Sequence, residues 1–123
     1  MASQYFIGVD IGTAGTKAAI FDLQGKQLAT AYEESRLYYP RVGCVEQRPE
    51  DFYASTLSTV REVVHKSGVN PKDVLSIAFS GQMAGVLAID SKWRPVIPYD
   101  SWLDIRCRDY IDYVNKNYAD LLI

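Results

Sequence analysis

The segment Gly8–Lys17, with the sequence GVDIGTAGTK, decides the fold class. It joins two short apolar stretches, Tyr5–Asp10 and Lys17–Asp22, through a turn that contains two glycines. A third stretch, Gln27–Tyr32, follows after the single-glycine turn Leu23–Lys26. Strands separated by so few residues pair in an antiparallel manner, because a parallel pair needs a crossover of about a dozen residues or more. The beginning of the chain therefore predicts a three-stranded antiparallel meander.

One amphipathic helix is expected after the meander. Pro49 takes the favoured first position of a helix, acidic residues fill the first turn, and Gly68 is a suitable stop. The apolar residues between them recur at i, i+4, i+7 and i+11, which gives one stripe that can face a core. The residues of this stripe are Tyr53, Leu57, Val60 and Val64.

The rest of the chain continues to alternate between strand and helix. Val74–Ser80 is apolar almost throughout, which is typical of a strand covered on both faces. A shorter strand is predicted at Val86–Asp90 and a helix over Asp104–Asn117. The predicted order is β-β-β-α-β-β-α, an α/β fold with a mixed sheet that starts with the antiparallel meander.

Composition limits the class of protein. The chain has 123 residues, enough for one compact domain, and its formal charge of −2 comes without a long basic run, so neither nucleic acid nor an anionic membrane is an expected partner. No apolar stretch approaches the roughly 18–20 residues that span a bilayer, and the first residues lack a signal-peptide pattern. Cys44 and Cys107 have neither CxxC spacing nor histidine partners, which indicates reduced thiols and a cytoplasmic location.

The turn between the first two strands has the composition of a phosphate-binding loop. Its glycines allow positive φ and let the backbone approach a ligand closely, and successive backbone N–H groups in such a turn form a concave anion site. Asp10 offers a hard carboxylate oxygen of the kind that holds Mg²⁺ beside bound phosphates. The candidate phosphate-binding residues of the loop are Gly12, Thr13, Gly15, Thr16 and Lys17.

Two familiar phosphate motifs do not fit this loop. A Walker A loop needs the spacing GxxxxGK[ST], which neither Gly12 nor Gly15 meets. A Rossmann fingerprint needs GxGxxG between a strand and a helix, whereas this loop joins two strands. A plain hairpin turn is the structural alternative, since turns with glycine are common. On residue spacing alone, the phosphate loop and the plain turn both stay open.

Four segments of the chain, in the same order, resemble one family of enzymes. Gly8–Asp22 (GVDIGTAGTKAAIFD) looks like the first phosphate-binding hairpin of the superfamily that contains actin, heat-shock chaperones and sugar kinases. Val42–Phe52 (VGCVEQRPEDF) resembles a Gly-Trp-Val-Glu-Gln-Asp-Pro stretch, and Phe79–Gly85 (FSGQMAG) resembles Ser-Gly-Gln-Met-His-Gly. Arg94–Arg106 (RPVIPYDSWLDIR) resembles an Arg-Pro segment followed by Trp-Asn-Asp and Arg. Together they resemble the FGGY family of carbohydrate kinases, and Phe79–Gly85 points to its xylulose kinase branch.

This resemblance implies a ribonuclease H-like domain of the actin-like ATPase class. Residues 1–123 would form the N-terminal part of that first domain, without its remainder and without the second, ATP-binding domain. We therefore expect the chain by itself to be inactive. Its last residues, Leu121–Ile123, are apolar and uncapped, and we expect them to mark a cut rather than a natural terminus.

The resemblance also implies an activity. An FGGY kinase transfers the γ-phosphoryl group of ATP, with Mg²⁺, to a hydroxyl of a ketose or polyol, and the segments favour a pentulose such as xylulose. The loop would hold the ATP phosphates, and Asp10 would be the metal ligand. The catalytic base, an aspartate, and the adenine pocket are expected beyond residue 123. The complete enzyme is expected to be a homodimer.

Two of the four segments line the sugar site in the xylulose kinase branch. The corresponding candidates for substrate binding are Gln82, Met83, Ala84, Trp102 and Asp104. The chain departs from the family pattern at three positions, with Cys44 in place of Trp, Ala84 in place of His and Leu103 in place of Asn. Because a histidine is both a donor and an acceptor, its loss predicts a site that binds fewer hydroxyls or a different set of them.

Two other classes of protein remain as alternatives. A non-catalytic binding or scaffold domain of the ATPase fold would use the hairpin only as structure, and an actin-like or chaperone-like ATPase would use ATP without a sugar. The segments FSGQMAG and SWLDIR favour the kinase, since the other two classes need neither. Single residues have structural alternatives too, because Met83 could fill a core, Trp102 could anchor packing and Asp104 could cap a helix.

Overall fold

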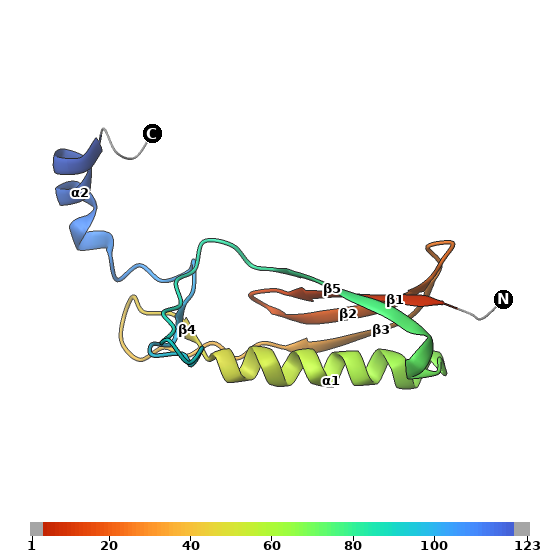
Figure 1. Cartoon of the computed structure of the whole chain (residues 1–123). Helices are drawn as coiled ribbons and strands as arrows, with labels where there is room; N and C mark the ends of the chain where they lie inside the picture. Colours follow the sequence, from red (N-terminus) through yellow and green to blue (C-terminus); the bar gives the residue numbers. More distant parts are fainter. Residues whose placement is uncertain (1–3, 120–123) are drawn as a thin grey trace.

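The chain forms a four-stranded mixed sheet with one long helix against it (Figure 1). The computed structural model describes residues 4–119, so the expectation for Leu121–Ile123 lies outside the described residues. The strands are β1 (Tyr5–Ile11), β2 (Gly15–Asp22), β3 (Gln27–Glu34) and β5 (Val74–Gly81). Their order is β3-β2-β1-β5, with β1–β2 and β2–β3 antiparallel and β5 parallel to β1. The predicted meander is confirmed.

The helix α1 (Pro49–Ser67) ends where the sequence predicts. Pro49 stands at its first turn, where the missing N–H costs nothing. Gly68 closes it in the left-handed conformation, with φ of 68°, and its N–H donates to the carbonyl of His65 at 3.3 Å. This helix covers one face of the meander and supplies the connection from β3 to β5.

The buried stripe of α1 differs from the predicted apolar stripe. The fully buried positions are Ser55, Thr59 and Val63, whereas Tyr53 is exposed. Small hydroxyl side chains bring the helix close to the sheet, and their polarity is satisfied locally: Thr59 Oγ1 donates to the Ser55 carbonyl at 2.8 Å. The prediction is correct for Val60 and Val64, which pack partly buried against the core, and wrong for Tyr53, because a ranking by hydropathy overlooks the small hydroxyl residues of the buried face.

The hydrophobic core lies between α1 and the sheet. Alternate residues of the meander point toward the helix, as the period of a strand requires. The buried members of this core are Ile7, Val9, Ala18, Ile20, Ala31 and Val63. Side chains at the intervening positions of β1 and β2, including Asp10 and Lys17, therefore lie on the opposite face of the sheet.

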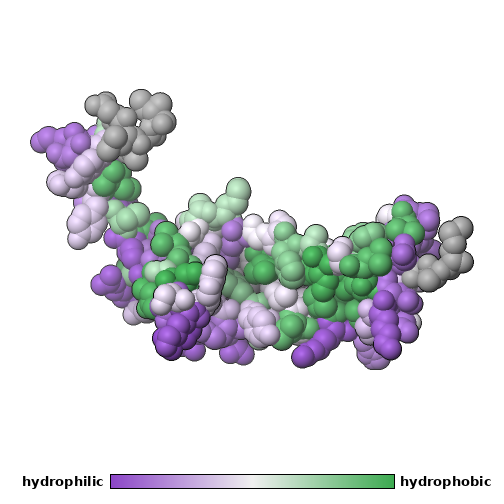
Figure 2. Space-filling view, in the orientation of Figure 1, coloured by the Kyte–Doolittle hydropathy of each residue, from purple (hydrophilic) through white to green (hydrophobic). Residues whose placement is uncertain are grey.

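Strand β5 is less covered than predicted. Leu75, Ile77 and Phe79 are exposed, Phe79 at 62%. Figure 2 shows hydrophobic surface over this part of the sheet. The reason is its position: β5 pairs with β1 alone, at the edge of the sheet, while α1 packs mainly on β2 and β3. Within residues 4–119, β5 is therefore not covered on both faces, and that prediction is wrong.

The second half of the chain departs from prediction in two places. Val86–Asp90 forms only isolated bridges, from Val86 to Asp100 and from Ile89 to Pro95, instead of a strand. The real pairing is between two-residue strands, β4 (Glu46–Gln47) and β6 (Tyr99–Asp100), which are antiparallel. The residues of β4 and β6 are far apart in the sequence, and the periodicity of apolar residues along a segment does not reveal such a pairing.

The last helix is shorter than predicted. Residues 104–110 form turns and a single 3₁₀ turn (Arg108–Tyr110), and α2 spans only Ile111–Tyr118. Asp104 lies before the 3₁₀ turn, and its carboxylate is part of an ion-pair cluster described below. Figure 1 shows α2 apart from the sheet and from α1, and its tyrosines are exposed. None of the helices within residues 4–119 combines the length and the hydropathy needed to cross a bilayer.

Candidate functional site

The β1–β2 hairpin encloses an open cavity of about 460 Å³. The turn is closed by the N–H of Gly12, which donates to the carbonyl of Gly15 at 3.0 Å. Asp10 and Lys17 face each other across the two strands. The cavity is lined by Asp10, Gly12, Thr13, Ala14, Gly15, Lys17 and Tyr32. The hairpin therefore gathers a carboxylate, an ammonium group and a tight backbone turn at one place.

The two hairpin glycines are needed for close approach rather than for positive φ. Neither Gly12 nor Gly15 is among the glycines with positive φ in the described residues. A Cβ on Gly15 would lie 2.2 Å from the ring of Tyr32, whose hydroxyl donates to the Ala14 carbonyl at 2.8 Å. A Cβ on Gly12 would lie 3.1 Å from the Gly15 carbonyl oxygen. The prediction that these two glycines adopt positive φ is therefore wrong.

The Asp10 carboxylate is exposed in the cavity. Within residues 4–119 it forms no side-chain hydrogen bond and no ion pair, so its oxygens are available to a ligand. The same part of the chain holds no group of three or more His, Cys, Asp or Glu side chains that could bind a metal by themselves. A single exposed carboxylate beside this cavity would fit Mg²⁺ if phosphates bound there, because proteins often hold Mg²⁺ with one or two carboxylates plus substrate phosphates.

The two threonines of the hairpin have partners of their own. Thr16 is fully buried, and its Oγ1 shares a hydrogen bond of 2.7 Å with Ser55 Oγ in α1. The Thr16 hydroxyl thus packs β2 against the helix, contrary to the expectation that it adds a donor to the loop. Thr13, by contrast, faces the segments that were predicted to bind the sugar.

Thr13, Gln82 and Gln47 form a closed ring of hydrogen bonds, and Trp102 donates to Thr13 from outside it. These four residues are here called the Thr13 ring. The Trp102 Nε1–H donates to Thr13 Oγ1 at 2.8 Å, and the Thr13 hydroxyl donates to Gln82 Oε1 at 2.7 Å. Gln82 Nε2 donates to Gln47 Oε1 at 2.8 Å, and Gln47 Nε2 donates to the Thr13 carbonyl at 3.4 Å. The structure therefore brings Gln82 and Trp102 together beside the β1–β2 hairpin.

The segment after β5 is open around Ala84. The Gln82 N–H donates to the carbonyl of Ile11 at 2.9 Å, which ties the end of β5 to the end of β1. Met83 is 83% exposed, so it does not fill a core. Ala84 is exposed and takes φ of 60°, a left-handed conformation that is uncommon for a residue with a Cβ and often marks a functional site.

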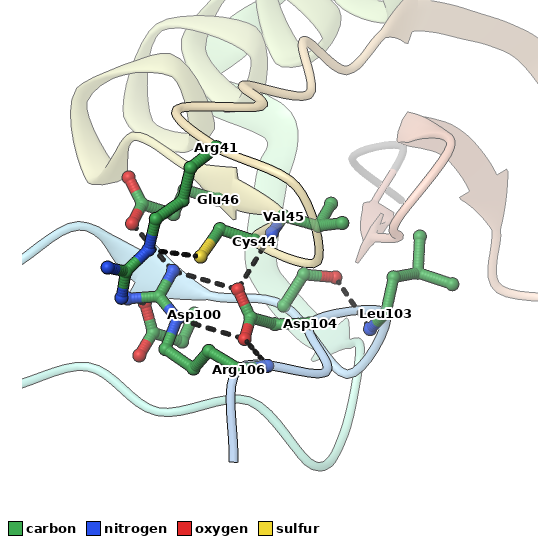
Figure 3. Close-up of polar contacts among 9 residues, drawn as sticks. Arg41, Cys44, Val45, Glu46, Asp100, Leu103, Asp104 and Arg106 are labelled. Carbon is green, nitrogen blue, oxygen red and sulfur yellow. Dashed lines mark hydrogen bonds and ion pairs between the residues drawn. The ribbon is translucent and has the colours of Figure 1, made fainter. Parts of the chain in front are cut away.

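Asp104 belongs to a different group, an ion-pair cluster around Arg106 (Figure 3). The Arg106 guanidinium contacts Glu46 at 2.6 Å, Asp104 at 2.8 Å and Asp100 at 3.2 Å. Asp104 also accepts from the N–H of Val45 at 2.7 Å, and its side chain is nearly buried. The predicted sugar contact of Asp104 is therefore replaced by a structural role, because both carboxylate oxygens already have partners.

Hydrogen bonds from the Arg106 side chain lower the pKa of Asp104 to about 2, against the opposing effect of burial. The same bonds raise the pKa of Arg106 above its already high ordinary value. The cluster joins β4 and β6 to the segment that carries Trp102. It fixes the position of one wall of the candidate site.

Acid should weaken this cluster in a defined pH range. The pKa of Asp104 is about 2 when folded and about 3.9 when unfolded, so the stabilisation is complete above the unfolded value and is lost as pH falls toward 2. Near pH 3 the free energy of unfolding should fall by roughly 1 kcal/mol per pH unit through this group. Urea unfolding of wild type and Asp104→Asn between pH 2 and 6 measures the effect. Equal acid slopes in the two proteins would refute it.

Sequence reasoning missed Gln47 and Arg106. Gln47 lies within the family-like segment Val42–Phe52, yet only its burial, at 1% exposure, and its contacts reveal its place in the Thr13 ring. Arg106 stands two residues after Asp104, a spacing that signals a local pair, but its bond to Glu46 spans 60 residues and needs the fold.

The site and the fold define a class of protein. The chain combines a mixed sheet that begins with a glycine-containing hairpin and polar residues after β5 that contact this hairpin. The family described as the FGGY family of carbohydrate kinases, N-terminal domain, matches residues 5–121. The chain belongs to the FGGY family of carbohydrate kinases.

Curated relatives include kinases for different acceptors. A glycerol kinase of Leptospira biflexa serovar Patoc is 32% identical over 94% of this chain, and the xylulose kinase of Bacillus subtilis is 30% identical over 98% of it. In both comparisons the match covers 24% of the relative. The chain thus spans about a quarter of the length of the curated relatives that it matches.

Solved structures share the fold. A gluconate kinase from Lactobacillus acidophilus superimposes with a TM-score of 0.87 at 23% identity, over 97% of this chain and 24% of that protein. A ligand-bound xylulose kinase from the same species has a TM-score of 0.86 at 24% identity, over 96% of this chain and 24% of that protein. The predicted actin-like ATPase fold, as a partial domain, is confirmed.

Proposed function

We propose that the chain supplies one wall of the active site of an ATP-dependent kinase that phosphorylates a sugar or polyol hydroxyl. The observation that carries this function is the direct contact of the phosphate hairpin with Gln82 and Trp102, which lie 69 and 89 residues from Thr13 in the sequence. Phosphoryl transfer needs the acceptor hydroxyl next to the terminal phosphate of ATP, and catalysis comes mostly from such positioning.

Each side of the contact has a role in the proposed reaction. The hairpin would hold the phosphates through its backbone N–H groups and Lys17, and Asp10 would hold Mg²⁺, which neutralises charge on the phosphates. The exposed indole of Trp102 and the amide of Gln82 would bind the acceptor. The catalytic base, the adenine pocket and the second domain would come from chain beyond residue 123, which makes the chain by itself inactive.

A scaffold domain remains the second candidate, since every contact of the Thr13 ring could be structural. The experiment that separates the two measures ADP release by the complete protein with glycerol, xylulose, ribulose and gluconate as acceptors. Acceptor-dependent ADP release supports the kinase. Its absence for all four acceptors, with tight ATP binding or without it, would favour the scaffold.

Position 84 should help to choose the acceptor. Ala84 lies exposed beside Gln82, where the xylulose kinase branch has a histidine, so one hydroxyl of xylulose would lack its partner. In the complete kinase, where the second domain would cover the site, an unpaired hydroxyl would cost about 1–3 kcal/mol, or roughly tenfold to a hundredfold in kcat/KM. Ala84→His should therefore raise kcat/KM for xylulose, and histidine tolerates the left-handed φ better than most residues.

The measurement compares kcat/KM of wild type and Ala84→His with xylulose, ribulose, glycerol and other polyols in the complete protein. Ala54→His serves as the matched control, because Ala54 is also an exposed alanine and lies in α1, outside the segments proposed to bind the acceptor. Strong preference of the wild type for xylulose, with no change in Ala84→His, would show that position 84 does not select the acceptor.

A further inference from the structure

The hydroxyl of Thr13 is fully engaged as a donor. A threonine hydroxyl has one proton to donate and two lone pairs to accept. Its proton goes to Gln82 Oε1 at 2.7 Å, and one lone pair receives the Trp102 Nε1–H at 2.8 Å. The oxygens of an ionised phosphate accept hydrogen bonds and cannot donate them. While the bond to Gln82 exists, the Thr13 side chain has no hydrogen-bond donor available for a phosphate oxygen.

Gln47 fixes the direction of the ring. Its own position is set by the pairing of β4 with β6 and by nearly complete burial. Gln47 Oε1 accepts from Gln82 Nε2 at 2.8 Å, so the amide of Gln82 is oriented from both ends: its nitrogen faces Gln47 and its oxygen faces Thr13. Hydrogen bonds that run in one direction around such a ring strengthen one another.

This orientation leaves defined groups for a ligand. Gln82 keeps one N–H on Nε2, and the Trp102 indole is 56% exposed with its N–H already directed at Thr13. A rotated Gln82 amide would present an acceptor where the ring now presents a donor. The ring therefore determines which hydroxyl of an acceptor can pair at Gln82.

We propose that Thr13 and Gln47 are positioning residues for the acceptor, and that the Thr13 side chain does not bind phosphate. This inference rests on the proposed function and deepens it, because it assigns a residue of the phosphate hairpin to the recognition of the sugar or polyol. The backbone of the hairpin keeps its role toward ATP. Loss of the Thr13 hydroxyl should therefore raise the KM for the acceptor rather than the KM for ATP.

The test uses Thr13→Val in the complete kinase, since valine keeps the shape of threonine and removes the hydroxyl. The KM for the acceptor should rise by about fivefold to tenfold, the effect of one lost hydrogen bond, while the KM for ATP changes less than about twofold. Thr13→Ser, which restores the hydroxyl, should return the acceptor KM close to the wild-type value. A rise in the KM for ATP alone would make Thr13 a phosphate ligand and overturn the inference.

A double-mutant cycle adds a readout that a general packing defect would not produce. Trp102→Phe removes the indole N–H, and in combination with Thr13→Val its effect on the acceptor KM should be smaller than the product of the two single effects. Fully multiplicative effects would overturn the inference while leaving the proposed function intact. A wild-type protein that phosphorylates no acceptor would overturn both.

Discussion

Replacement of Asp10 by asparagine should strongly lower the rate of phosphoryl transfer and leave the fold intact. Asparagine keeps the size and the hydrogen-bonding capacity of the side chain and removes the charge proposed to hold Mg²⁺ at the ATP phosphates. Loss of this metal ligand should lower turnover by roughly 10²-fold or more, in line with the several kcal/mol that a metal contributes to transition-state charge stabilisation.

The structure explains why stability should not change. The Asp10 carboxylate is exposed and forms no side-chain hydrogen bond or ion pair within residues 4–119, so its charge supports no folded contact there. Asp73→Asn is the matched control, because Asp73 lies just before β5, at the other end of the sheet from the hairpin. Its turnover should remain near that of the wild type.

Turnover, Mg²⁺ dependence and melting temperature of the complete protein decide this prediction. The expected pattern is lost turnover at an unchanged melting temperature. The opposite pattern, a lower melting temperature with near-normal turnover of the folded fraction, would assign Asp10 and the hairpin to structure alone.

The sequence predicts those parts of the fold that depend on local rules. The connection between β1 and β2 is too short for anything but an antiparallel pair, and β2–β3 follows the same rule. Pro49 and Gly68 fix the ends of α1 because each acts through its own backbone geometry. None of these predictions needs information from a distant part of the chain.

The wrong predictions concern features that depend on residues far apart in the sequence. Ser55 and Thr59 are buried because the sheet approaches α1 closely and their hydroxyls find partners, which hydropathy cannot reveal. Strand β4 has two residues and exists only through β6, more than fifty residues later. Asp104 looked like a sugar contact or a helix cap, and its actual partners include Val45.

The sequence also predicts only part of the candidate site, because the remaining contacts depend on tertiary structure. Gln82 and Trp102 were identified by resemblance, and the structure places both in the Thr13 ring. Nothing in the spacing of Thr13 indicates that its hydroxyl donates to Gln82. That contact depends on the register of β1 with β5 and on Gln47, both of which are tertiary features.

Removal of Arg106 should destabilise the wall of the site that carries Trp102. Arg106 is the shared partner of Glu46, Asp100 and Asp104. Without its charge, three carboxylates remain close together and Asp104 stays nearly buried without its main partner. Arg106→Met, which keeps the length of the aliphatic stem, should lower the free energy of unfolding by about 2–4 kcal/mol, because breaking a partly buried ion pair leaves uncompensated charge.

A matched control comes from an exposed pair. Arg94 contacts Asp90 at 2.7 Å, with 68% of the Arg94 side chain exposed, so Arg94→Met should cost less than about 1 kcal/mol. Arg106→Lys should recover only part of the loss, since an ammonium group cannot reproduce the fork of bonds that the guanidinium makes. Urea unfolding of the four proteins at pH 7, followed by tryptophan fluorescence, measures these differences.

The functional consequence follows from the position of Trp102 between Asp100 and Asp104, two residues that Arg106 holds in place. In the complete kinase, Arg106→Met should raise the KM for the acceptor more than the KM for ATP, because the hairpin is held by β1 and β2 rather than by the cluster. Addition of Asp104→Asn to Arg106→Met should restore part of the stability, since it removes one of the carboxylates left without a cationic partner. Equal stability of Arg106→Met and Arg94→Met would show that the Arg106 cluster contributes no more than an ordinary surface ion pair, and the link from this cluster to Trp102 would then fail.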